Sequence, residues 1–496
     1  MGAAEHIAAL DIVGVTATKD VDLSGIPLCI DCDGSLIRTD LLHEAVFLML
    51  KQAPLSLLKL PFWLARGRAY MKERIAACVS FSQSAFPFNE DVLAIAQKAA
   101  AEGRLLVLAT ASPRAFAEQV AARCPVKFDE VLASEHGHNL SGIHKAQALS
   151  QRFGERRFDY VGNSRSDLPV WAAARTAIVV SSNRRLSAAA ATGTPVEQVI
   201  EVQAPKASDY VRALRVHQWV KNLLVFIPVL AAHRIRDLDV LLASCWTFIA
   251  FCLVASTAYV LNDLLDLDSD RRHERKRSRP FASGRIPVWH GAVAVPALLG
   301  AAALVASTLS LAVGAVLAGY FACTLAYSIR LKRQPIVDVM MLAGLYTLRV
   351  LAGGTATGIH PSFWLLAFCM FIFLSLAIVK RFSELLLTLK RSERVASGRG
   401  YNVNDLPALM ALGASSGMMA VLVLALYVNS AEIADINDDV RALWLMPPLL
   451  LYWMCRLWMK THRGEVHDDP VVFALTDWQS QLVLTISVLL FLAAAP

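Results

Sequence analysis

Nine apolar runs, each of roughly 14–23 residues, occupy the last three-fifths of the chain and limit its fold more than any other feature. A run of about 20 apolar residues is long enough to cross a bilayer as a helix. With 56% hydrophobic and only 18% charged residues among 496, the chain is too apolar to be wholly soluble. We therefore predict an all-α bundle of nine transmembrane helices over Trp219–Ala232, Leu241–Leu261, Val288–Thr308, Ala312–Ser328, Val337–Leu351, Phe363–Val379, Leu406–Val428, Leu443–Trp458 and Val471–Ala493.

Lys and Arg gather in the connections after the second, fourth, sixth and eighth apolar runs, as in Arg271–Arg285 and Lys380–Arg399. The connection Asn429–Asp439 holds acids and no base, although Arg234 and Arg236 in the first connection depart from this alternation. Cytoplasmic loops of membrane proteins are enriched in Lys and Arg. We therefore expect a multi-pass protein of the inner (plasma) membrane, with its N-terminal domain in the cytoplasm and its C-terminus outside. The net charge of +7 follows from these loops, so we expect no nucleic-acid partner.

The first 200 residues differ in composition, because charges recur every few positions, and we predict a cytosolic α/β domain over residues 1–200. A polar linker that contains Pro205 follows over residues 201–215, and the transmembrane domain covers residues 216–496. Residues Met1–Gly25 lack the basic and then apolar pattern of a signal peptide. The nine cysteines are scattered, which excludes a disulfide-framed scaffold.

Two carboxylates, Asp31 and Asp33, end the first apolar run of this domain and precede a glycine. Such a pair suits phosphoryl transfer, because one carboxylate can attack phosphorus and bind Mg²⁺ while the other protonates the leaving oxygen. Three further features follow in order: Thr110 after a second apolar run, Leu105–Leu108; Lys145 at a predicted helix start; and Asn163 and Asp167 after a third run, Phe158–Val161.

This order of strand, hydroxyl, lysine and acidic loop resembles the haloacid dehalogenase (HAD) phosphatase superfamily over roughly Ile26–Ser182. The resemblance implies a Rossmann-like α/β fold with a helical cap over about residues 41–100, most clearly Leu41–Phe86. It also implies a role for each residue of the motifs: Asp31 as nucleophile, Asp33 as general acid/base, Thr110 and Lys145 as phosphate ligands, and Asp31, Asp33, Asn163 and Asp167 as the Mg²⁺ site. Asn163 stands where the family usually has Asp, and an amide oxygen is a weaker Mg²⁺ ligand. An active phosphatase and a degenerate, structural HAD domain therefore both stay open.

A second acidic cluster follows the second apolar run, where Asp263, Asp266 and Asp270 are spaced at i, i+3 and i+7. This spacing predicts one helix face with three carboxylates. Such carboxylates repel one another unless a cation binds them, and Mg²⁺ prefers oxygen ligands. Arg279 and Arg285 come shortly afterwards, which is the arrangement that a diphosphate would need.

The pattern NDxxDxxxD, a basic segment and then RPxxSG resembles the UbiA superfamily of intramembrane prenyltransferases, over about Val216–Ala495. The resemblance implies nine helices around a cavity that opens to the cytosol, with a Mg²⁺-bridged diphosphate at its mouth. Further motifs resemble the decaprenyl-phosphate phosphoribosyltransferase branch, such as QWVKN at Gln218–Asn222 and KRxxE at Lys380–Glu384. Members of that branch join a polyprenyl phosphate to C1 of phosphoribosyl pyrophosphate and release diphosphate.

In this branch Asp263, Asp266 and Asp270 would hold Mg²⁺, which carries the charge of the leaving diphosphate. The candidate substrate-binding residues of the domain are Lys221, Asn262, Arg279, Arg285, Tyr327, Lys332, Asp338, Arg349, Lys380 and Arg381. Arg349 lies inside an apolar helix, where a charge is costly and usually functional. Asp338 lies at a predicted helix start, where a simple cap is an equal rival.

The leading hypothesis is a phosphoribosyltransferase whose product carries a 5-phosphate that the HAD domain removes. An alternative is a prenyltransferase that moves a prenyl group from prenyl diphosphate to an aromatic acceptor such as 4-hydroxybenzoate. Aromatic prenyltransferases usually carry a second DxxxD motif, and here Leu342 stands four residues after Asp338, which argues against this alternative. A third reading is a lipid-binding scaffold without activity, which the two acid clusters disfavour.

Overall fold

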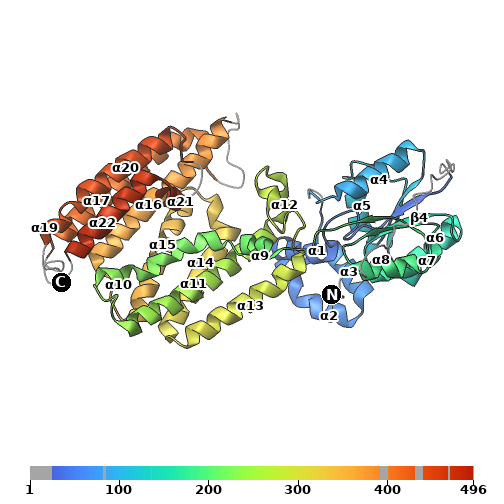
Figure 1. Ribbon diagram of the computed structural model, residues 1–496, viewed down its shortest axis with the longest axis horizontal. Helices are drawn as coiled ribbons and strands as arrows, with labels where there is room; N and C mark the ends of the chain where they lie inside the picture. The colour runs from blue at the N-terminus through green and yellow to red at the C-terminus, as the bar shows by residue number, and fades with distance from the viewer. Residues whose placement is uncertain are drawn as a thin grey trace, which may run out of the picture. The chain divides into compact units, whose positions relative to one another are not determined.

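The computed structural model describes residues 25–81, 85–135, 137–390, 400–430, 440–466 and 470–494. It divides into two compact units, one of Met1–Asp209 with Leu264–Trp289 and one of Tyr210–Asp263 with His290–Pro496 (Figure 1). Residues 391–399 and 431–439, which entered the prediction of membrane topology, lie outside the described residues.

A parallel sheet of six strands forms the centre of the first unit, in the order β3-β2-β1-β4-β5-β6. The predicted strands at Pro27, Leu105 and Phe158 are confirmed as β1, β2 and β4. The strand order turns at β1, and ligands of such sheets bind beside the carboxyl ends of the strands at that point. The strands are β1 Leu28–Ile30, β2 Leu106–Pro113, β3 Glu130–Ser134, β4 Asp159–Gly162, β5 Ala177–Val180 and β6 Val196–Ile200.

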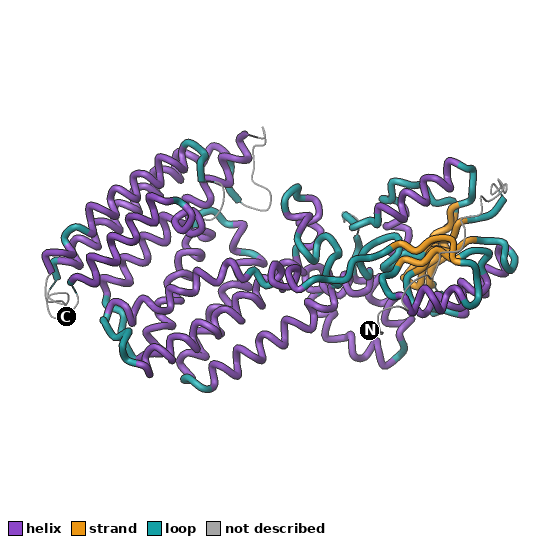
Figure 2. Tube along the Cα trace, viewed as in Figure 1, coloured by secondary structure: helices purple, strands orange, loops and turns teal. Residues whose placement is uncertain are grey.

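Helices cover both faces of the sheet, as Figure 2 shows. Alternate side chains of a strand point to opposite faces, so that Leu28 and Ile30 pack with α4 and α5 while Cys29 packs with α6, α7 and α8. The predicted α/β fold of the N-terminal domain is therefore confirmed. The helices are α4 Glu90–Ala101, α5 Arg114–Ala121, α6 Ile143–Phe153, α7 Leu168–Ala173 and α8 Arg184–Ala191.

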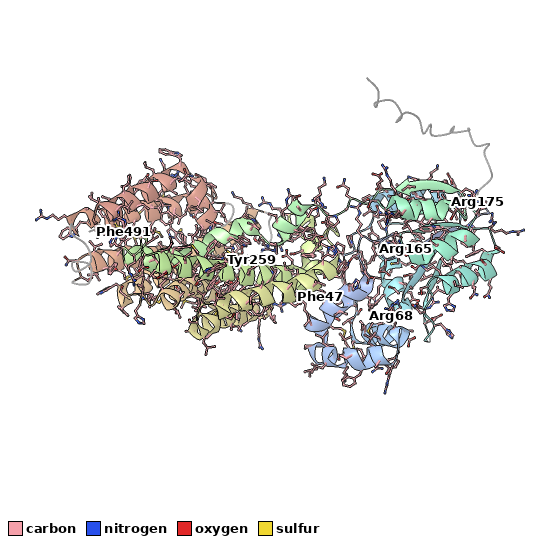
Figure 3. All side chains as sticks on the ribbon, turned by 60° about the horizontal axis from the view of Figure 1, so that its bottom comes forward. Phe47, Arg68, Arg165, Arg175, Tyr259 and Phe491 are labelled. Carbon is pink, nitrogen blue, oxygen red and sulfur yellow. The ribbon has the colours of Figure 1, made fainter. Side chains whose placement is uncertain are left out.

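A group of helices is inserted between β1 and β2, where the cap was expected. Asp40 begins the first of them, because its carboxylate accepts hydrogen bonds from the backbone N–H groups of Leu42 and His43. Figure 3 marks Phe47 on α1 and Arg68 at the start of α3. The inserted elements are α1 Leu41–Gln52, the 3₁₀ helix η1 Pro54–Lys59, α2 Leu60–Ala65 and α3 Arg68–Cys78.

The segment Leu264–Trp289 belongs to the first unit and contains α12 Leu267–Arg272 and the 3₁₀ helix η4 Lys276–Ser278. Helix α11, Leu238–Leu265, ends just before Asp266, whose φ of −102° and ψ of 13° are not helical. The expectation that Asp263, Asp266 and Asp270 share one helix face is therefore wrong. Asp is a poor residue for a helix interior, and neighbouring carboxylates repel one another, so the helix is interrupted at this cluster.

Helices make up the second unit, and six of the described helices are long and apolar enough to span a membrane. Counting the pair α21 and α22, which is bent by 83°, as one span raises this number to seven. The α-helices of this unit from α11 onward are α11, α13 Val288–Ser307, α14 Leu311–Ile329, α15 Val337–Thr357, α16 Phe363–Lys390, α17 Leu406–Val428, the short α19 Val440–Leu443, α20 Met446–His462, α21 Pro470–Thr476 and α22 Trp478–Ala493.

The prediction of nine spans is thus not met by the described residues. The first apolar run forms the 3₁₀ helix η3 Val216–Phe226 and the short helix α10 Ile227–Ala231 instead of one long helix. Two polar side chains of η3, Lys221 and Asn222, are buried in the protein. Helix α20 has only 17 residues. The helix α9, Ala207–Ala213, lies within the segment expected to be a linker.

Gly353 shows how closely η3 approaches α15. A Cβ atom at this position would overlap the carbonyl oxygen of Val225 in η3, whereas a Cβ at Gly344 on the same helix would meet open space. Backbone packing in the second unit therefore depends on the missing side chain at Gly353.

We predict that Gly353→Ala destabilises the protein by about 1–3 kcal/mol, because the added methyl group must push η3 away from α15. Gly344→Ala should leave stability unchanged or raise it by up to about 1 kcal/mol, since alanine restricts the unfolded chain. Thermal unfolding of the full chain in detergent measures both effects. Equal melting temperatures for the two variants would contradict the close approach of η3.

Candidate active sites

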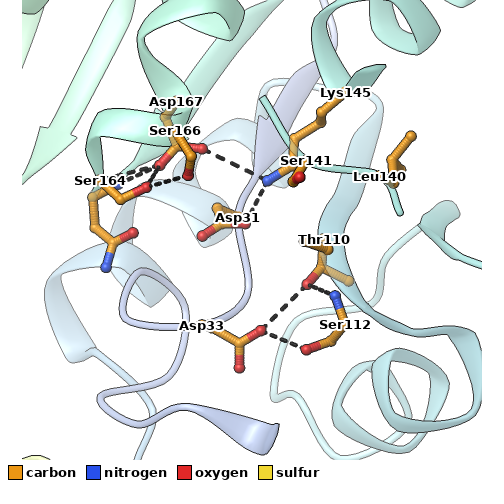
Figure 4. A network of polar contacts seen from close by, with 12 residues as sticks. Asp31, Asp33, Thr110, Ser112, Leu140, Ser141, Lys145, Ser164, Ser166 and Asp167 are labelled. Atoms are coloured by element: carbon orange, nitrogen blue, oxygen red, sulfur yellow. Dashed lines mark hydrogen bonds and ion pairs between the residues drawn. The ribbon is translucent and has the colours of Figure 1, made fainter. Parts of the chain in front are cut away.

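The first candidate site lies where three neighbouring strands end (Figure 4). Asp31 and Asp33 follow β1, Thr110 lies near the end of β2, and Asn163 and Asp167 follow β4. The carboxyl ends of parallel strands meet at one edge of a sheet, which explains why these distant positions come together. All of them except Thr110 line a cleft of about 480 Å³.

Lys145 places a positive charge beside the predicted nucleophile. It is the third residue of α6, and its buried Nζ atom donates to Asp31 Oδ1 at 2.7 Å and to the Tyr160 hydroxyl at 2.8 Å. The Tyr160 hydroxyl donates in turn to Asp167 Oδ1 at 2.9 Å. Sequence reasoning missed Tyr160, because it lies within the apolar run of β4 and resembles an ordinary core residue.

Asp167 holds the loop after β4. Its Oδ2 atom accepts hydrogen bonds from the backbone N–H groups of Asn163 and Ser164 and from the Ser164 hydroxyl. Because both of its oxygens accept hydrogen bonds, Asp167 supports the site by orienting the loop and Lys145. Asn163 lies directly against Gly34, where a Cβ atom would overlap the amide and where φ is +75°. The glycine after the two aspartates is thus required by both space and backbone conformation.

Asp33 is held from both sides. Its Oδ1 atom accepts from the backbone N–H of Leu41 at 2.8 Å, and its Oδ2 atom accepts from the Ser112 hydroxyl at 2.6 Å. The Thr110 hydroxyl lies 3.5 Å from the same Oδ2 and accepts from the backbone N–H of Ser112. Ser112 was not among the predicted residues, although it lies two positions after Thr110. This arrangement fixes the Asp33 carboxylate in the cleft, and its role as general acid/base stays a prediction.

Burial makes both carboxylates of the motif weak acids. It raises the pKa of Asp31 to about 7, even though Lys145 lowers it, and raises the pKa of Asp33 to about 6 with a further contribution from Asp40. A raised carboxyl pKa means that negative charge is unfavourable there and that a cation would stabilise it.

The donor set of this cleft fits Mg²⁺ in its chemistry. Asp31 and Asp33 supply carboxylate oxygens and Asn163 supplies an amide, and all three line the same cleft. Within the part of the chain that the structure describes, no group of three or more His, Cys, Asp or Glu side chains is arranged around a metal position. The metal roles of Asp31, Asp33, Asn163 and Asp167 therefore stay predictions.

The inserted helices add cations to the cleft. Lys72 of α3 donates to the carbonyl oxygen of Ala111 at 2.8 Å and to Asn139 at 3.3 Å, and Arg68 lines the same cleft. Burial lowers the pKa of Lys72. Neither residue was predicted, because a basic residue on a polar helix looks like a surface charge. Three basic side chains, two from the insertion and Lys145, thus line a cleft suited to a phosphate group.

Each carboxylate of the second acidic cluster is paired with a basic side chain. In the first unit Asp270 pairs with Arg279 at 2.6 Å and Asp266 pairs with Lys51 at 2.9 Å. In the second unit the buried Asp263 pairs with Arg215. Of the other predicted residues here, Asn262 is half-buried on α11, and the exposed Arg285 lies 3.7 Å from Asp209.

Arg349 is buried on α15 within a polar cluster of the second unit. Its guanidinium group donates to Asn222 Oδ1 and to the Tyr320 hydroxyl, each at 2.8 Å. It also lies over the rings of Tyr320 and Tyr346, and Lys221 lies 5.8 Å from the centre of the Tyr346 ring. Cation–π contacts stabilise charges that are shielded from water. The aromatic partners were not predicted, since their apolar surroundings hide their role.

Asp338, Arg381 and Tyr327 form a second buried polar cluster. Arg381 donates to both oxygens of Asp338, and the Tyr327 hydroxyl donates to Asp338 Oδ1 at 2.8 Å. Asp338 thus uses its carboxylate in an ion pair and is not the N-cap of α15, which is Ile336, while its substrate role stays a prediction. The two remaining predicted residues, Lys332 and Lys380, are half-buried.

Comparison with known proteins agrees with both halves of the structure. Residues 223–428 match the UbiA prenyltransferase family, and residues 29–171 match the haloacid dehalogenase-like hydrolases. A decaprenyl-phosphate phosphoribosyltransferase of Mycolicibacterium smegmatis is 32% identical over 285 residues, which cover 56% of this chain and 89% of that protein. The chain belongs to the UbiA prenyltransferase family. It carries a HAD-like domain at its N-terminus, and its apolar helices make it a multi-pass membrane protein.

Two further relatives of this UbiA-family protein are similar over most of their own length. The nodulation protein NoeC of Azorhizobium caulinodans is 36% identical over 272 residues, which cover 55% of this chain and 88% of NoeC. The uncharacterized protein y4nM of Sinorhizobium fredii is 34% identical over 461 residues, which cover 92% of this chain and 89% of y4nM. The y4nM match extends over the HAD-like and UbiA-family domains together.

We predict that Asp33→Asn stabilises the HAD-like domain about twice as much at pH 8 as at pH 5. An ordinary aspartate has a pKa near 4, and the folded protein raises that of Asp33 to about 6. The cost of its charge is therefore fully present above pH 6 and disappears as the pH falls towards 4. Calorimetry of the full chain with EDTA should show a gain of about 1–2 kcal/mol at pH 8. An equal gain at both pH values would contradict this account.

We predict that Asp338→Asn destabilises the UbiA-family domain by about 3 kcal/mol, because it removes the buried counter-charge of Arg381. Asp239→Asn is the matched control, since Asp239 is exposed in the first turn of α11. The melting temperature and the yield of folded protein in detergent measure the effect. If the two variants have the same melting temperature, the Asp338–Arg381 ion pair does not stabilise the fold.

Proposed function

We propose that the UbiA-family domain transfers 5-phosphoribose from phosphoribosyl pyrophosphate to a polyprenyl phosphate such as decaprenyl phosphate and releases diphosphate. One observation carries the proposal: this chain covers 89% of a protein named decaprenyl-phosphate phosphoribosyltransferase, at 32% identity. The buried cations of the domain support it, since two anionic substrates need positive partners.

The reaction needs cations more than it needs a base. An oxygen of the lipid phosphate is already anionic and attacks C1 of the sugar, while the bond between C1 and the diphosphate breaks. Mg²⁺ held by Asp263, Asp266 and Asp270 would supply charge neutralisation to the diphosphate when bound. In the structure these carboxylates pair with Arg215, Lys51 and Arg279. Diphosphate oxygens can take over such basic groups and leave the carboxylates to the metal.

Lys221 and Arg349 are the proposed partners of a substrate phosphate within the second unit. Both are buried, and both lie over the ring of Tyr346. A cation in such surroundings attracts a phosphate group more strongly than an exposed one, because water screens it less. The two residues come from η3 and α15, the elements that Gly353 brings into close approach.

The HAD-like domain is proposed to remove the 5-phosphate of the lipid-linked product. Asp31 would attack phosphorus and form an aspartyl phosphate as the bond to the sugar 5-oxygen breaks, and Asp33 would give that oxygen its proton. Asp33 would then take a proton from a water molecule that attacks phosphorus, which breaks the bond between phosphorus and Asp31 and releases inorganic phosphate. The pKa of about 6 for Asp33 suits both roles near neutral pH. Lys145, Lys72 and Arg68 would hold the phosphate oxygens.

Both reactions are proposed to occur at the cytoplasmic face of the inner membrane, with the C-terminus outside. The basic connections between the apolar runs support this orientation. The charge of the sugar donor supports it as well. Phosphoribosyl pyrophosphate is a charged molecule that cannot cross a bilayer unaided.

Membranes that contain the full chain should convert phosphoribosyl pyrophosphate labelled in the ribose into an organic-extractable lipid when decaprenyl phosphate and Mg²⁺ are present. Asp263→Asn should lower this transfer by about a hundredfold or more, since the leaving group loses its charge neutralisation. Asp239→Asn, at the other end of the same helix, should retain full transfer. If only labelled prenyl diphosphate with 4-hydroxybenzoate gives extractable product, the enzyme is an aromatic prenyltransferase and the proposal is wrong.

Asp31→Asn tests the phosphatase step separately. The variant should accumulate phosphoribosyl lipid and release inorganic phosphate from it about a thousandfold more slowly, because the nucleophile is lost. Its rate of sugar transfer should stay within about twofold of the natural protein. Unchanged release of the 5-phosphate would show that the HAD-like domain does not act on this product.

A further inference from the structure

The segment Leu264–Trp289, which carries part of the acidic cluster, packs against the helical insertion of the HAD-like domain within the first unit. Asp268 Oδ1 accepts from the backbone N–H of Ala85 at 2.9 Å. Gly284, with φ of +74°, lies so close to Arg38 that a Cβ atom would overlap its carbonyl oxygen. A stretch that the sequence assigns to the UbiA-family domain is thus built into the fold of the phosphatase.

A buried ion pair is at the centre of this packing. Arg271 Nη1 donates to Glu44 Oε2 at 2.9 Å and Nη2 donates to Oε1 at 2.5 Å, and each side chain is only 5% exposed. The guanidinium group also donates to the carbonyl oxygens of Ala282 and Ala85. A buried charge that loses its partner is strongly unfavourable. This bidentate pair therefore fixes the position of Arg271 and of Asp270 beside it in the chain.

Glu44 connects the same pair to the phosphatase site. It lies in the first turn of α1 and also accepts from the Thr39 hydroxyl. The first residue of α1, Leu41, donates its backbone N–H to Asp33 Oδ1 at 2.8 Å. The first turn of α1 thus has contacts with both sites. Leu41 donates to Asp33, the proposed acid/base of the phosphatase, and Glu44 accepts from Arg271, which lies next to Asp270 of the acidic cluster.

We propose that Glu44 and Arg271 are positioning residues for the transfer reaction: the phosphatase insertion holds the segment with Asp266 and Asp270 in the arrangement that binds Mg²⁺ and diphosphate. The inference rests on the proposed function, because it assigns the metal to these aspartates. Lys51 of α1 forms an ion pair with Asp266 at 2.9 Å, so the same helix contacts the segment Leu264–Trp289 at a second point. The HAD-like domain then contributes to sugar transfer as well as to phosphate removal.

The test uses the full chain in membranes and measures sugar transfer as a function of Mg²⁺ concentration. Glu44→Gln and Arg271→Gln should each raise the Mg²⁺ concentration for half-maximal transfer by about tenfold, while the maximal rate changes by less than about threefold. The double variant should be no worse than either single one, because both remove the same contact. Arg271→Lys keeps the charge and one donor and should lie in between.

Arg272→Gln is the matched control. Arg272 is the next residue in the chain. It forms a solvent-exposed ion pair with Asp268, four positions before it. Such pairs contribute little, so its Mg²⁺ requirement should equal that of the natural protein.

Hydrogen exchange of the same proteins without substrate reports on the packing itself. Glu44→Gln should speed exchange at least tenfold over residues 266–286 and leave β2 unchanged. Unchanged exchange, or faster exchange with an unchanged Mg²⁺ requirement, would overturn the positioning role. If the natural protein shows no sugar transfer, the proposed function is wrong, and so is the positioning role of Glu44 and Arg271. The hydrogen-exchange data would still show whether the two residues hold the segment in place.

Discussion

The ion pair between Asp31 and Lys145 shows the constraint on which the described structure depends. Both groups are buried, and neither charge could stay there without the other. Other polar sites among the described residues also pair a buried carboxylate with a basic side chain. The pairs are Asp31–Lys145, Glu44–Arg271, Asp263–Arg215, Asp270–Arg279 and Asp338–Arg381. Lys145, Arg215 and Arg279 are proposed to contact phosphate oxygens, whereas Arg271 is proposed to position the acidic segment.

These pairs also suit the two chemistries that we propose for this chain. A phosphatase and a phosphoribosyltransferase both act on groups with several negative charges, and both need acids that hold a metal beside bases that hold phosphate. In the HAD-like domain the sheet edge gathers these groups. In the segment Leu264–Trp289 a surface of the HAD-like domain itself supplies Lys51 and Glu44 as partners. The proposed product of one reaction is the proposed substrate of the other, so a shared element between the sites is chemically reasonable.

Local sequence pattern was sufficient to predict the strands and the site residues that follow them. The short apolar runs became β1, β2 and β4, and the parallel sheet then brought Asp31, Thr110 and Lys145 to one edge. The membrane character followed from the length of the apolar runs. Periodicity alone misled at the acidic cluster, because a spacing that suits one helix does not show whether the helix continues through repelling carboxylates. The length of an apolar run misled at Trp219–Ala232, where apolar residues form a 3₁₀ segment with buried polar side chains.

The sequence by itself determined that an α/β part precedes an apolar helical part, and it determined the acidic motifs and the families that they resemble, because these depend on residue type and spacing within short segments. The assignment of Leu264–Trp289 to the first unit came from the tertiary structure. Only the tertiary structure decided which partners those motifs have. Ser112, Tyr160 and Lys72 enter the candidate site of the HAD-like domain through contacts between segments far apart in the chain. The pair of Glu44 with Arg271 joins residues 227 positions apart. Contacts of this kind arise from the packing of whole elements, and no local pattern records them.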